Sequence, residues 1–177
     1  MFLMPNSASI VGDASTVSLA EQIVSTMTSR GLRLALAESL TGGALASAVV
    51  DVPGASAVLL GSIVAYDTAL KTSLLGVDSE LLQRMGAVDT QVASQMARGV
   101  RARLAAAAGV DVTRTFGLAC TGVAGPDPQD GKPVGTVFIA VDAPGGAQVH
   151  ELHLSGTRAE IRSAVVRHAL EFLAQAL

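Results

Sequence analysis

The residues best suited to chemistry lie in a short polar turn near the start of the chain. Glu38, Ser39 and Thr41 follow an apolar run, and two glycines precede a segment at 44–50 that is expected to be helical. A strand, a turn and a helix start can point backbone N–H groups and the positive end of a helix dipole at a ligand. Ser39 could therefore be a nucleophile or an anion contact. The alternative is an ordinary helix N-cap, because Ser and Thr are preferred there.

Tyr66 and Lys71 form a second candidate group. They lie in a segment that follows an apolar strand and opens a helix, and Lys132 is the only other lysine of the chain. A partly desolvated lysine has a lowered pKa and can act as a base toward a serine hydroxyl. Tyr66 would then relay a proton or orient the lysine. The alternative is a lysine on a helix surface and a packed tyrosine.

Two further glycine-containing turns, at 121–126 and 155–158, carry hydroxyl and backbone N–H groups. In an open α/β sheet such turns can collect at one edge, where ligands bind. Arg158 and Arg162 are one helical turn apart and could clamp an anion together. These features indicate a site for a phosphate-bearing small molecule. The alternative is three ordinary turns and a solvated arginine face.

Several other classes of site are disfavoured. The Gly-x4-Gly-Lys pattern of a Walker loop is absent, and no Gly-x-Gly-x-x-Gly follows the first strand. His150 and His153 point to opposite faces of an expected strand, so no metal site is expected. The net charge of -3 gives no footprint for nucleic acid. The single cysteine and the lack of a signal peptide or membrane-spanning run predict a cytoplasmic protein without membrane partners.

The pattern of apolar residues predicts one α/β domain, with a mixed sheet of about five strands between two helical layers. The apolar content of 50% provides a large core, and it also hints at a homo-oligomer through an apolar subunit interface. Residues 1–15 are expected to be a flexible tail, and 16–177 the folded domain. Helices are expected at 18–30, 44–50, 68–75, 78–84, 90–108 and 157–177, and strands at 32–37, 57–66, 115–120, 134–142 and 148–154. The strand at 57–66 could be two short strands broken at Gly61.

Six motifs occur in an order and approximate spacing that resemble the C-terminal domain of the CinA family, the nicotinamide-nucleotide amidases. They are Ala37-Glu-Ser-Leu-Thr-Gly-Gly43, Tyr66 with Lys71, Gly86-Ala-Val88, Thr121-Gly-Val-Ala-Gly-Pro126, Lys132-Pro-Val-Gly-Thr-Val137 and Ser155-Gly-Thr-Arg158. The resemblance covers about residues 19–177. It implies a three-layer α/β/α fold, and hydrolysis of nicotinamide mononucleotide to nicotinic acid mononucleotide and ammonia in pyridine nucleotide salvage. The chain resembles the stand-alone form of the family, which lacks the molybdopterin-binding-like domain of larger members.

Carried over by position, the resemblance implies that Ser39 is the nucleophile, Lys71 its base and Tyr66 an orienting or proton-shuttling group. It implies no metal and no organic cofactor. Residues expected to bind the nucleotide substrate are Glu38, Thr41, Gly42, Gly43, Thr121, Gly122, Ala124, Gly125, Arg158 and Arg162. Backbone N–H groups in one of the glycine turns would hold the oxyanion.

The chain departs from the family pattern at three places. Leu40 replaces a cysteine, Thr68 stands where the family tends to have asparagine, and Asp127-Pro-Gln-Asp-Gly131 replaces a glycine-rich segment. These departures keep two alternatives open. One is a catalytically weak module of the same fold that binds a nucleotide or a protein, linked to competence or DNA repair. The other is a structural subunit of an oligomer.

Overall fold

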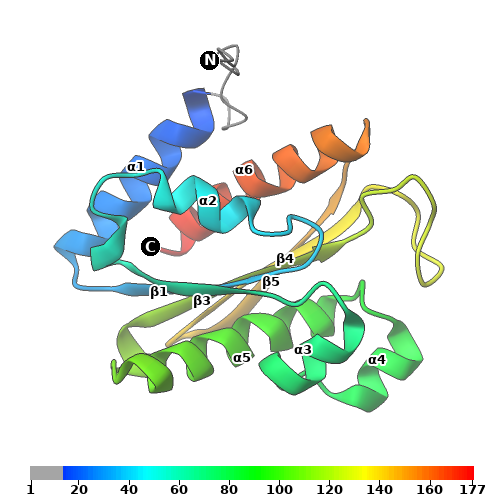
Figure 1. Cartoon of the computed structure of the whole chain (residues 1–177), viewed down its shortest axis with the longest axis horizontal. Coiled ribbons are helices and arrows are strands. Elements are labelled where there is room, and N and C mark those ends of the chain that lie inside the picture. Colours follow the sequence, from blue (N-terminus) through cyan, green and yellow to red (C-terminus); the bar gives the residue numbers. More distant parts are fainter. Residues whose placement is uncertain (1–13) are drawn as a thin grey trace, which may run out of the picture.

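The computed structural model describes residues 14–177, which form six α-helices and one five-stranded sheet. Two helical layers enclose the sheet (Figure 1), so the predicted α/β/α architecture is confirmed. The helices are α1 Ala14–Ser29, α2 Ala44–Val50, α3 Thr68–Leu75, α4 Ser79–Met85, α5 Thr90–Ala108 and α6 Arg158–Ala176. The strands are β1 Arg33–Glu38, β2 Leu59–Val64, β3 Thr115–Gly122, β4 Thr136–Ala143 and β5 Gly146–His153. Two short 3-10 turns, Ala55–Ala57 and Val112–Arg114, precede β2 and β3.

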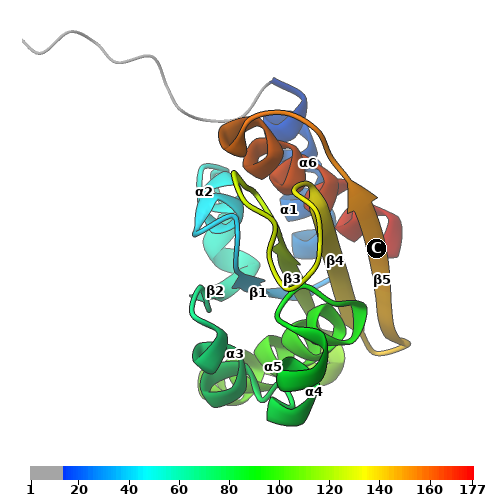
Figure 2. The same cartoon turned by 90° about the vertical axis from the view of Figure 1, so that its right-hand side faces the viewer.

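The strand order is β2-β1-β3-β4-β5. Strand β1 pairs in parallel with both β2 and β3, whereas β4 is antiparallel to its neighbours β3 and β5. The sheet is therefore mixed, with a parallel part that begins at β2 and an antiparallel part that ends at the β4–β5 hairpin. Viewed from the end of the sheet, the segment between β3 and β4 projects in front of the strands (Figure 2).

Each face of the sheet has its own apolar core. Helices α1, α2 and α6 cover one face, where Leu36, Leu118 and Ile139 are fully buried. Helices α3, α4 and α5 cover the other, where Met96 and Val100 of α5 pack on the sheet. The crossover from β1 through α2 and the crossover from β2 through α3, α4 and α5 thus lie on opposite faces of the sheet.

The expected elements are present, with shifted ends. Helix α1 begins at Ala14 rather than at 18, and β3 continues to Gly122 rather than stopping at 120. Strand β2 is one strand, with a register shift in its pairing with β1 at the position of the break that we expected at Gly61. Asp67 and Gly76 cap the two ends of α3. The expected tail at 1–15 lies almost entirely outside the described residues.

Within residues 14–177, no helix is both long enough and apolar enough to cross a lipid bilayer.

Candidate active site

A pocket lies at the carboxyl ends of β1 and β3, where the chain leaves β1 toward β2 and leaves β3 toward β4, on opposite sides in the strand order. This switch point is where open α/β sheets bind ligands. The pocket collects residues from five separate segments: Ser39 and Leu40, Tyr66 and Lys71, Ala87 and Val88, Thr121–Gly125 with Asp127 and Gln129, and Arg158. Two of the three predicted glycine turns therefore meet here, and the third contributes Arg158, the first residue of α6.

Ser39 and Lys71 are direct neighbours in the pocket. The Lys71 Nζ atom lies 3.2 Å from Ser39 Oγ and donates a hydrogen bond of 2.7 Å to the Ala65 carbonyl oxygen. Asp67 caps α3 through the Ala69 N–H, which begins the helix just before Lys71 and turns this side chain toward β1. The Nζ–Oγ distance is within the range in which an amine can take a proton from a hydroxyl.

Lys71 is buried, with 1% of its surface exposed. Its pKa is lowered from the ordinary lysine value, because burial disfavours the charged ammonium. The negative charges of Asp67 and Asp130 act in the opposite direction and raise this pKa by a smaller amount. Burial thus favours the neutral amine, which is the form that can act as a base.

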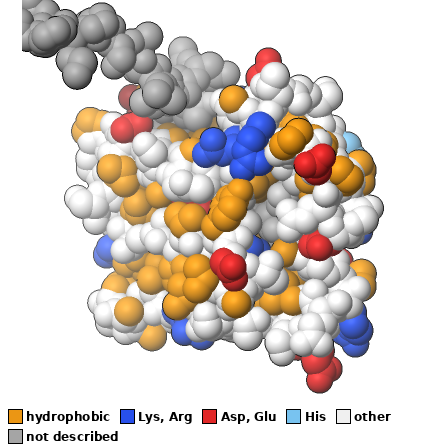
Figure 3. Space-filling view, turned by 45° about the vertical axis from the view of Figure 1, so that its right-hand side comes forward, with side chains coloured by type: hydrophobic (Ala, Val, Ile, Leu, Met, Phe, Trp, Pro, Cys, Tyr) orange, Lys and Arg blue, Asp and Glu red, His pale blue; other side chains and the backbone are white. Residues whose placement is uncertain are grey.

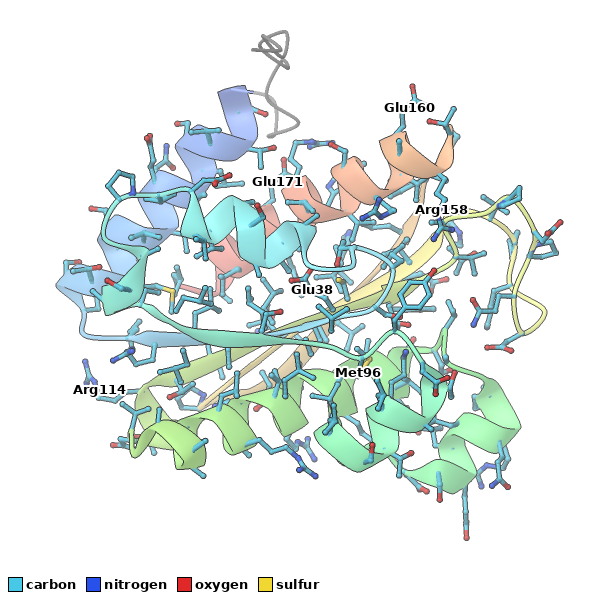
Figure 4. All side chains as sticks on the ribbon, viewed as in Figure 1. Glu38, Met96, Arg114, Arg158, Glu160 and Glu171 are labelled. Atoms are coloured by element: carbon cyan, nitrogen blue, oxygen red, sulfur yellow. The ribbon has the colours of Figure 1, made fainter. Side chains whose placement is uncertain are left out.

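Glu38 has a different position from the one expected of a substrate-binding residue. Its side chain is fully buried, and its two carboxylate oxygens accept five hydrogen bonds. The donors are the Thr41 and Ser62 hydroxyls and the N–H groups of Gly43, Leu45 and Ala46. Glu38 is not among the residues that line the pocket, and Figure 4 shows it between α2 and the sheet. It holds the turn that carries Ser39.

The N-terminus of α2 is therefore occupied by the protein itself. Gly43 is the N-cap and makes no side-chain cap hydrogen bond, so Ser39 does not cap this helix. The N–H groups at positions 43, 45 and 46 donate to Glu38, and those of Gly42 and Ala44 donate to carbonyl groups within the turn. Gly42 and Gly43 do not line the pocket. The expectation that the α2 N-terminus faces the ligand is not met.

Arg162 also supports the turn. Its guanidinium donates to the carbonyl oxygens of Leu40 and Thr41 at 2.8 and 2.7 Å. It is not a lining residue of the pocket, so the structure does not bring Arg158 and Arg162 together as a clamp. Thr41 is fully buried, and its hydroxyl contacts Glu38 and the Cys120 thiol. Burial raises the pKa of this thiol to about 11, so Cys120 packs beneath the turn as a protonated group.

Arg158 crosses the mouth of the pocket. It donates hydrogen bonds of 2.7 Å to the Gly125 carbonyl oxygen and 2.9 Å to the Tyr66 hydroxyl, and it forms no ion pair with any residue of the 14–177 region. Figure 4 shows it at the start of α6, beside the segment that follows β3. Tyr66, which is 61% exposed, is thus held by Arg158, and no described hydrogen bond joins it to Lys71.

Figure 3 shows how charged side chains are distributed on one face of the molecule. On the face in Figure 3, Lys and Arg side chains gather in one compact group in the upper half, and Asp and Glu side chains stand apart from one another. Positive charge is thus concentrated on part of this face. It is a local feature, because the chain as a whole has a net charge of -3.

The loop after β3 forms the other wall of the pocket. The Thr121 hydroxyl is buried and donates to the Ala87 carbonyl oxygen, so this expected site residue lies in the wall and supports it. Gly122 approaches β4 so closely that a Cβ atom there would lie 2.7 Å from the Thr136 carbonyl oxygen. Asp127 and Gln129, which we did not expect in the site, also line the pocket.

Comparisons with known proteins show which family this chain belongs to. The sequence pattern of the CinA C-terminal domain matches residues 16–177. The chain belongs to the CinA C-terminal domain family. The CinA-like protein of Frankia casuarinae is 46% identical over 160 residues, which are 90% of this chain and 35% of that protein. The CinA-like protein of Dictyoglomus thermophilum is 40% identical over 171 residues, 95% of this chain and 39% of that protein. The chain thus spans little more than a third of these relatives.

Solved structures of the CinA family agree with the fold. The competence/damage inducible protein CihA of Agrobacterium tumefaciens has a TM-score of 0.85 and 38% identity, and the match covers 94% of this chain and 98% of that one. A CinA-superfamily protein of Escherichia coli has a TM-score of 0.84 and 31% identity, covering 100% of this chain and 99% of that one. This domain therefore corresponds to nearly the whole of each solved chain.

Two of the departures from the CinA pattern can now be located. Leu40 is 4% exposed and packs in the apolar core on the α2 side, while part of it lines the pocket beside Ser39. Thr68 is the first residue of α3 and is exposed, while Asp67 before it supplies the N-cap. Neither change interrupts the contact between Ser39 and Lys71.

Proposed function

We propose that this CinA-family domain is a metal-independent serine amidohydrolase that acts on a nicotinamide nucleotide. The observation that carries the proposal is the 3.2 Å approach of a buried lysine amine to the Ser39 hydroxyl. A pure binding module has no need for a lysine that is kept from water and in contact with a serine. The substrate class follows from the resemblance of the motifs to the nicotinamide-nucleotide amidases, and nicotinamide mononucleotide is the substrate to test.

In the proposed reaction Ser39 Oγ attacks the carboxamide carbon while neutral Lys71 accepts its proton. The resulting lysine ammonium then gives a proton to the departing nitrogen, so that ammonia leaves and an acyl-enzyme remains. Water, deprotonated by Lys71, attacks the acyl carbon, and the carboxylic acid leaves as Ser39 regains its proton. The net change adds one water molecule and releases one ammonia, and no cofactor takes part.

Backbone geometry limits where the oxyanion can be held. The N–H groups at positions 42–46 all donate within the α2 turn, so that turn has none of these to offer. The loop at 121–125 is the glycine turn that remains beside Ser39 in the pocket. We place the oxyanion contact there, where a fixed N–H group stabilises the charge that develops during attack.

The phosphate is assigned to Arg158, because this guanidinium lies at the pocket mouth without a carboxylate partner among residues 14–177. Its present partners, a carbonyl and a phenol, are neutral acceptors. An anionic phosphate makes a stronger, charge-assisted hydrogen bond and would compete with them. Substrate binding would then free Tyr66 from Arg158 and let its hydroxyl turn toward the reacting groups.

The decisive experiment measures ammonia release from nicotinamide mononucleotide by the purified protein and by Ser39→Ala. Steady release that is lost in the variant supports the proposed amidase and its nucleophile. Release that survives in Ser39→Ala removes Ser39 from this role. If neither protein releases ammonia while the nucleotide still raises the melting temperature, the domain is a nucleotide-binding module.

A further inference from the structure

The segment between β3 and β4 contains a tight turn at its tip. Gln129 and Lys132 exchange two backbone hydrogen bonds of 3.1 and 2.8 Å, with Asp130 and Gly131 between them. Both intervening residues have positive φ, of 51° and 74°. These values are typical of a type I′ turn, for which Asp-Gly is a preferred pair. The segment is therefore a short, defined hairpin.

This hairpin is fastened to the opposite wall of the pocket. The Asp130 carboxylate accepts a 2.9 Å hydrogen bond from the Ala87 N–H, while the Thr121 hydroxyl holds the Ala87 carbonyl. Gly86 has a φ of 76°, and a Cβ atom there would overlap the Asp130 side chain. Figure 2 shows the segment reaching from the α6 side of the sheet down to the turn after α4. The hairpin thus spans the two layers and has a fixed place beside the pocket.

Two side chains of the segment between β3 and β4 line the pocket and have no hydrogen-bond or ion-pair partner among residues 14–177. Asp127 and Gln129 belong to the lining, and neither side chain makes a hydrogen bond or ion pair within the described part of the chain. A carboxylate accepts hydrogen bonds only, and an amide both accepts and donates. The carboxylate disfavours a phosphate at this place. It favours hydroxyl donors, as acidic side chains do when they bind the ribose of a dinucleotide.

We propose that Asp127 and Gln129 form a subsite for the hydroxyl groups of a ribose, in the pocket that they share with Ser39 and Arg158. The hairpin anchor through Asp130 fixes this subsite in advance of binding. This inference rests on the proposed function, since it assumes one ligand that reaches from Ser39 to Arg158. It adds a sugar-recognition element contributed by the segment between β3 and β4.

The test compares nicotinamide mononucleotide with its 2′-deoxy and 3′-deoxy forms. For the unmodified protein, kcat/KM is expected to be roughly 10- to 100-fold lower for at least one deoxy form, the range expected for a lost hydrogen bond to a charged group. Asp127→Ala should bring this ratio close to one, and Asp127→Asn, which keeps an acceptor oxygen, should give an intermediate ratio. Asp51→Asn, at the exposed end of α2, is the control and should keep the full ratio.

A second readout separates this inference from the proposed function. The three nucleotides are also compared by the rise in melting temperature that each produces, which requires no turnover. Hydroxyl-dependent stabilisation that Asp127→Ala removes supports the subsite even if no ammonia is released. Equal kcat/KM and equal stabilisation for all three nucleotides would overturn the subsite and leave the amidase intact. No turnover and no stabilisation by any nucleotide would overturn both.

Discussion

At the level of single residues, the proposed reaction depends on the protonation of Lys71. Burial lowers the pKa of this amine, while nearby acidic groups, Asp67 first among them, raise it. Neutral lysine is the form that can accept the Ser39 proton, so activity should rise with pH as Lys71 loses its proton and level off above its pKa. The acidic limb of the pH profile therefore reports this pKa.

Removing the charge of Asp67 should move that limb. In Asp67→Asn the charge that favours the ammonium is lost, so the pKa of Lys71 falls further and the acidic limb of kcat/KM moves to lower pH. Asparagine is a good N-cap and keeps the acceptor for the Ala69 N–H, so α3 should remain in place. Ammonia release measured from about pH 5 to 10 gives the profile.

Asp78 provides the matched control for this prediction. It caps α4 in the same way, by accepting a hydrogen bond from the Glu80 N–H, but it is not among the groups that shift the pKa of Lys71. Asp78→Asn should leave the limb where it is. A limb that stays fixed in Asp67→Asn, or moves to higher pH, would show that Lys71 is not the group that titrates.

At the level of elements, the β1–α2 turn is the structure that presents Ser39. Glu38 accepts three backbone N–H groups at the start of α2 and one hydroxyl from β2, so one carboxylate ties a strand, a helix and the neighbouring strand together. Arg162 of α6 holds two carbonyl oxygens of the same turn. The serine is thus fixed from both sides by charged groups that do not line the pocket.

Glu38→Gln should therefore weaken both stability and activity. The amide places N–H donors where backbone N–H groups need acceptors, and the variant should lower the free energy of unfolding by about 3 kcal/mol. Ser39 loses its fixed position, so kcat should fall more than KM rises. Denaturant unfolding and ammonia kinetics provide the two measurements. Arg162→Met should affect kcat in the same direction, because it frees the carbonyls of the turn.

The capping box of α6 gives a control with the same chemistry at an exposed place. Glu160 accepts a hydrogen bond from the Thr157 N–H at the surface, and that interaction lowers the pKa of the Glu160 carboxyl. Glu160→Gln should have a much smaller effect on unfolding than Glu38→Gln, because water can replace the lost partner. Equal effects of the two variants would mean that burial of Glu38 does not matter for the turn.

At the level of the whole molecule, local signals predicted the elements and tertiary contacts decided the site. The bounds expected for α2, α3 and α5 agree with the structure. Each of these helices has a glycine cap at one end and an aspartate cap at the other, and such caps depend only on residues nearby in the sequence. Strand β3 is longer than expected because Gly122 pairs with Val137 of β4, a partner that no local pattern specifies.

The same distinction between local signals and tertiary contacts explains which parts of the candidate site could be predicted. A contact between Ser39 and Lys71 was predicted as one of two alternatives, because a partly desolvated lysine can act as a base toward a serine hydroxyl. The roles of Glu38 and Arg162 were not, because a polar residue before a helix looks the same whether its partner is a ligand or the helix itself. Only the folded chain shows that Glu38 and Arg162 have hydrogen-bond partners in the backbone of the turn itself.

Helix α5 determines how close the site residues can come, through a glycine that faces α3. A Cβ atom at Gly99 would overlap the carbonyl oxygen of Leu75, the last residue of α3. Gly117 of β3 allows an equally close approach between the sheet and α5, since a Cβ atom there would overlap the Ala97 carbonyl oxygen of α5. The sheet, α5 and α3 are therefore stacked in direct backbone contact, and α3 carries Lys71 at the top of this stack.

Gly99→Ala should disturb the site from a distance. Alanine in a helix interior is favoured over glycine by about 1 kcal/mol, so an effect on the helix alone would stabilise the protein. Because the new methyl group must push α3 away, we expect instead a net loss of roughly 1–3 kcal/mol. The shift should also lengthen the Nζ–Oγ distance between Lys71 and Ser39 and reduce kcat by on the order of 10- to 100-fold.

The substitution Arg98→Ala, at the exposed neighbouring position, controls for the added alanine and should leave both the stability and kcat near their original values. A Gly99→Ala variant with greater stability and full activity would show that α3 tolerates displacement, and that Lys71 is not positioned by its helix.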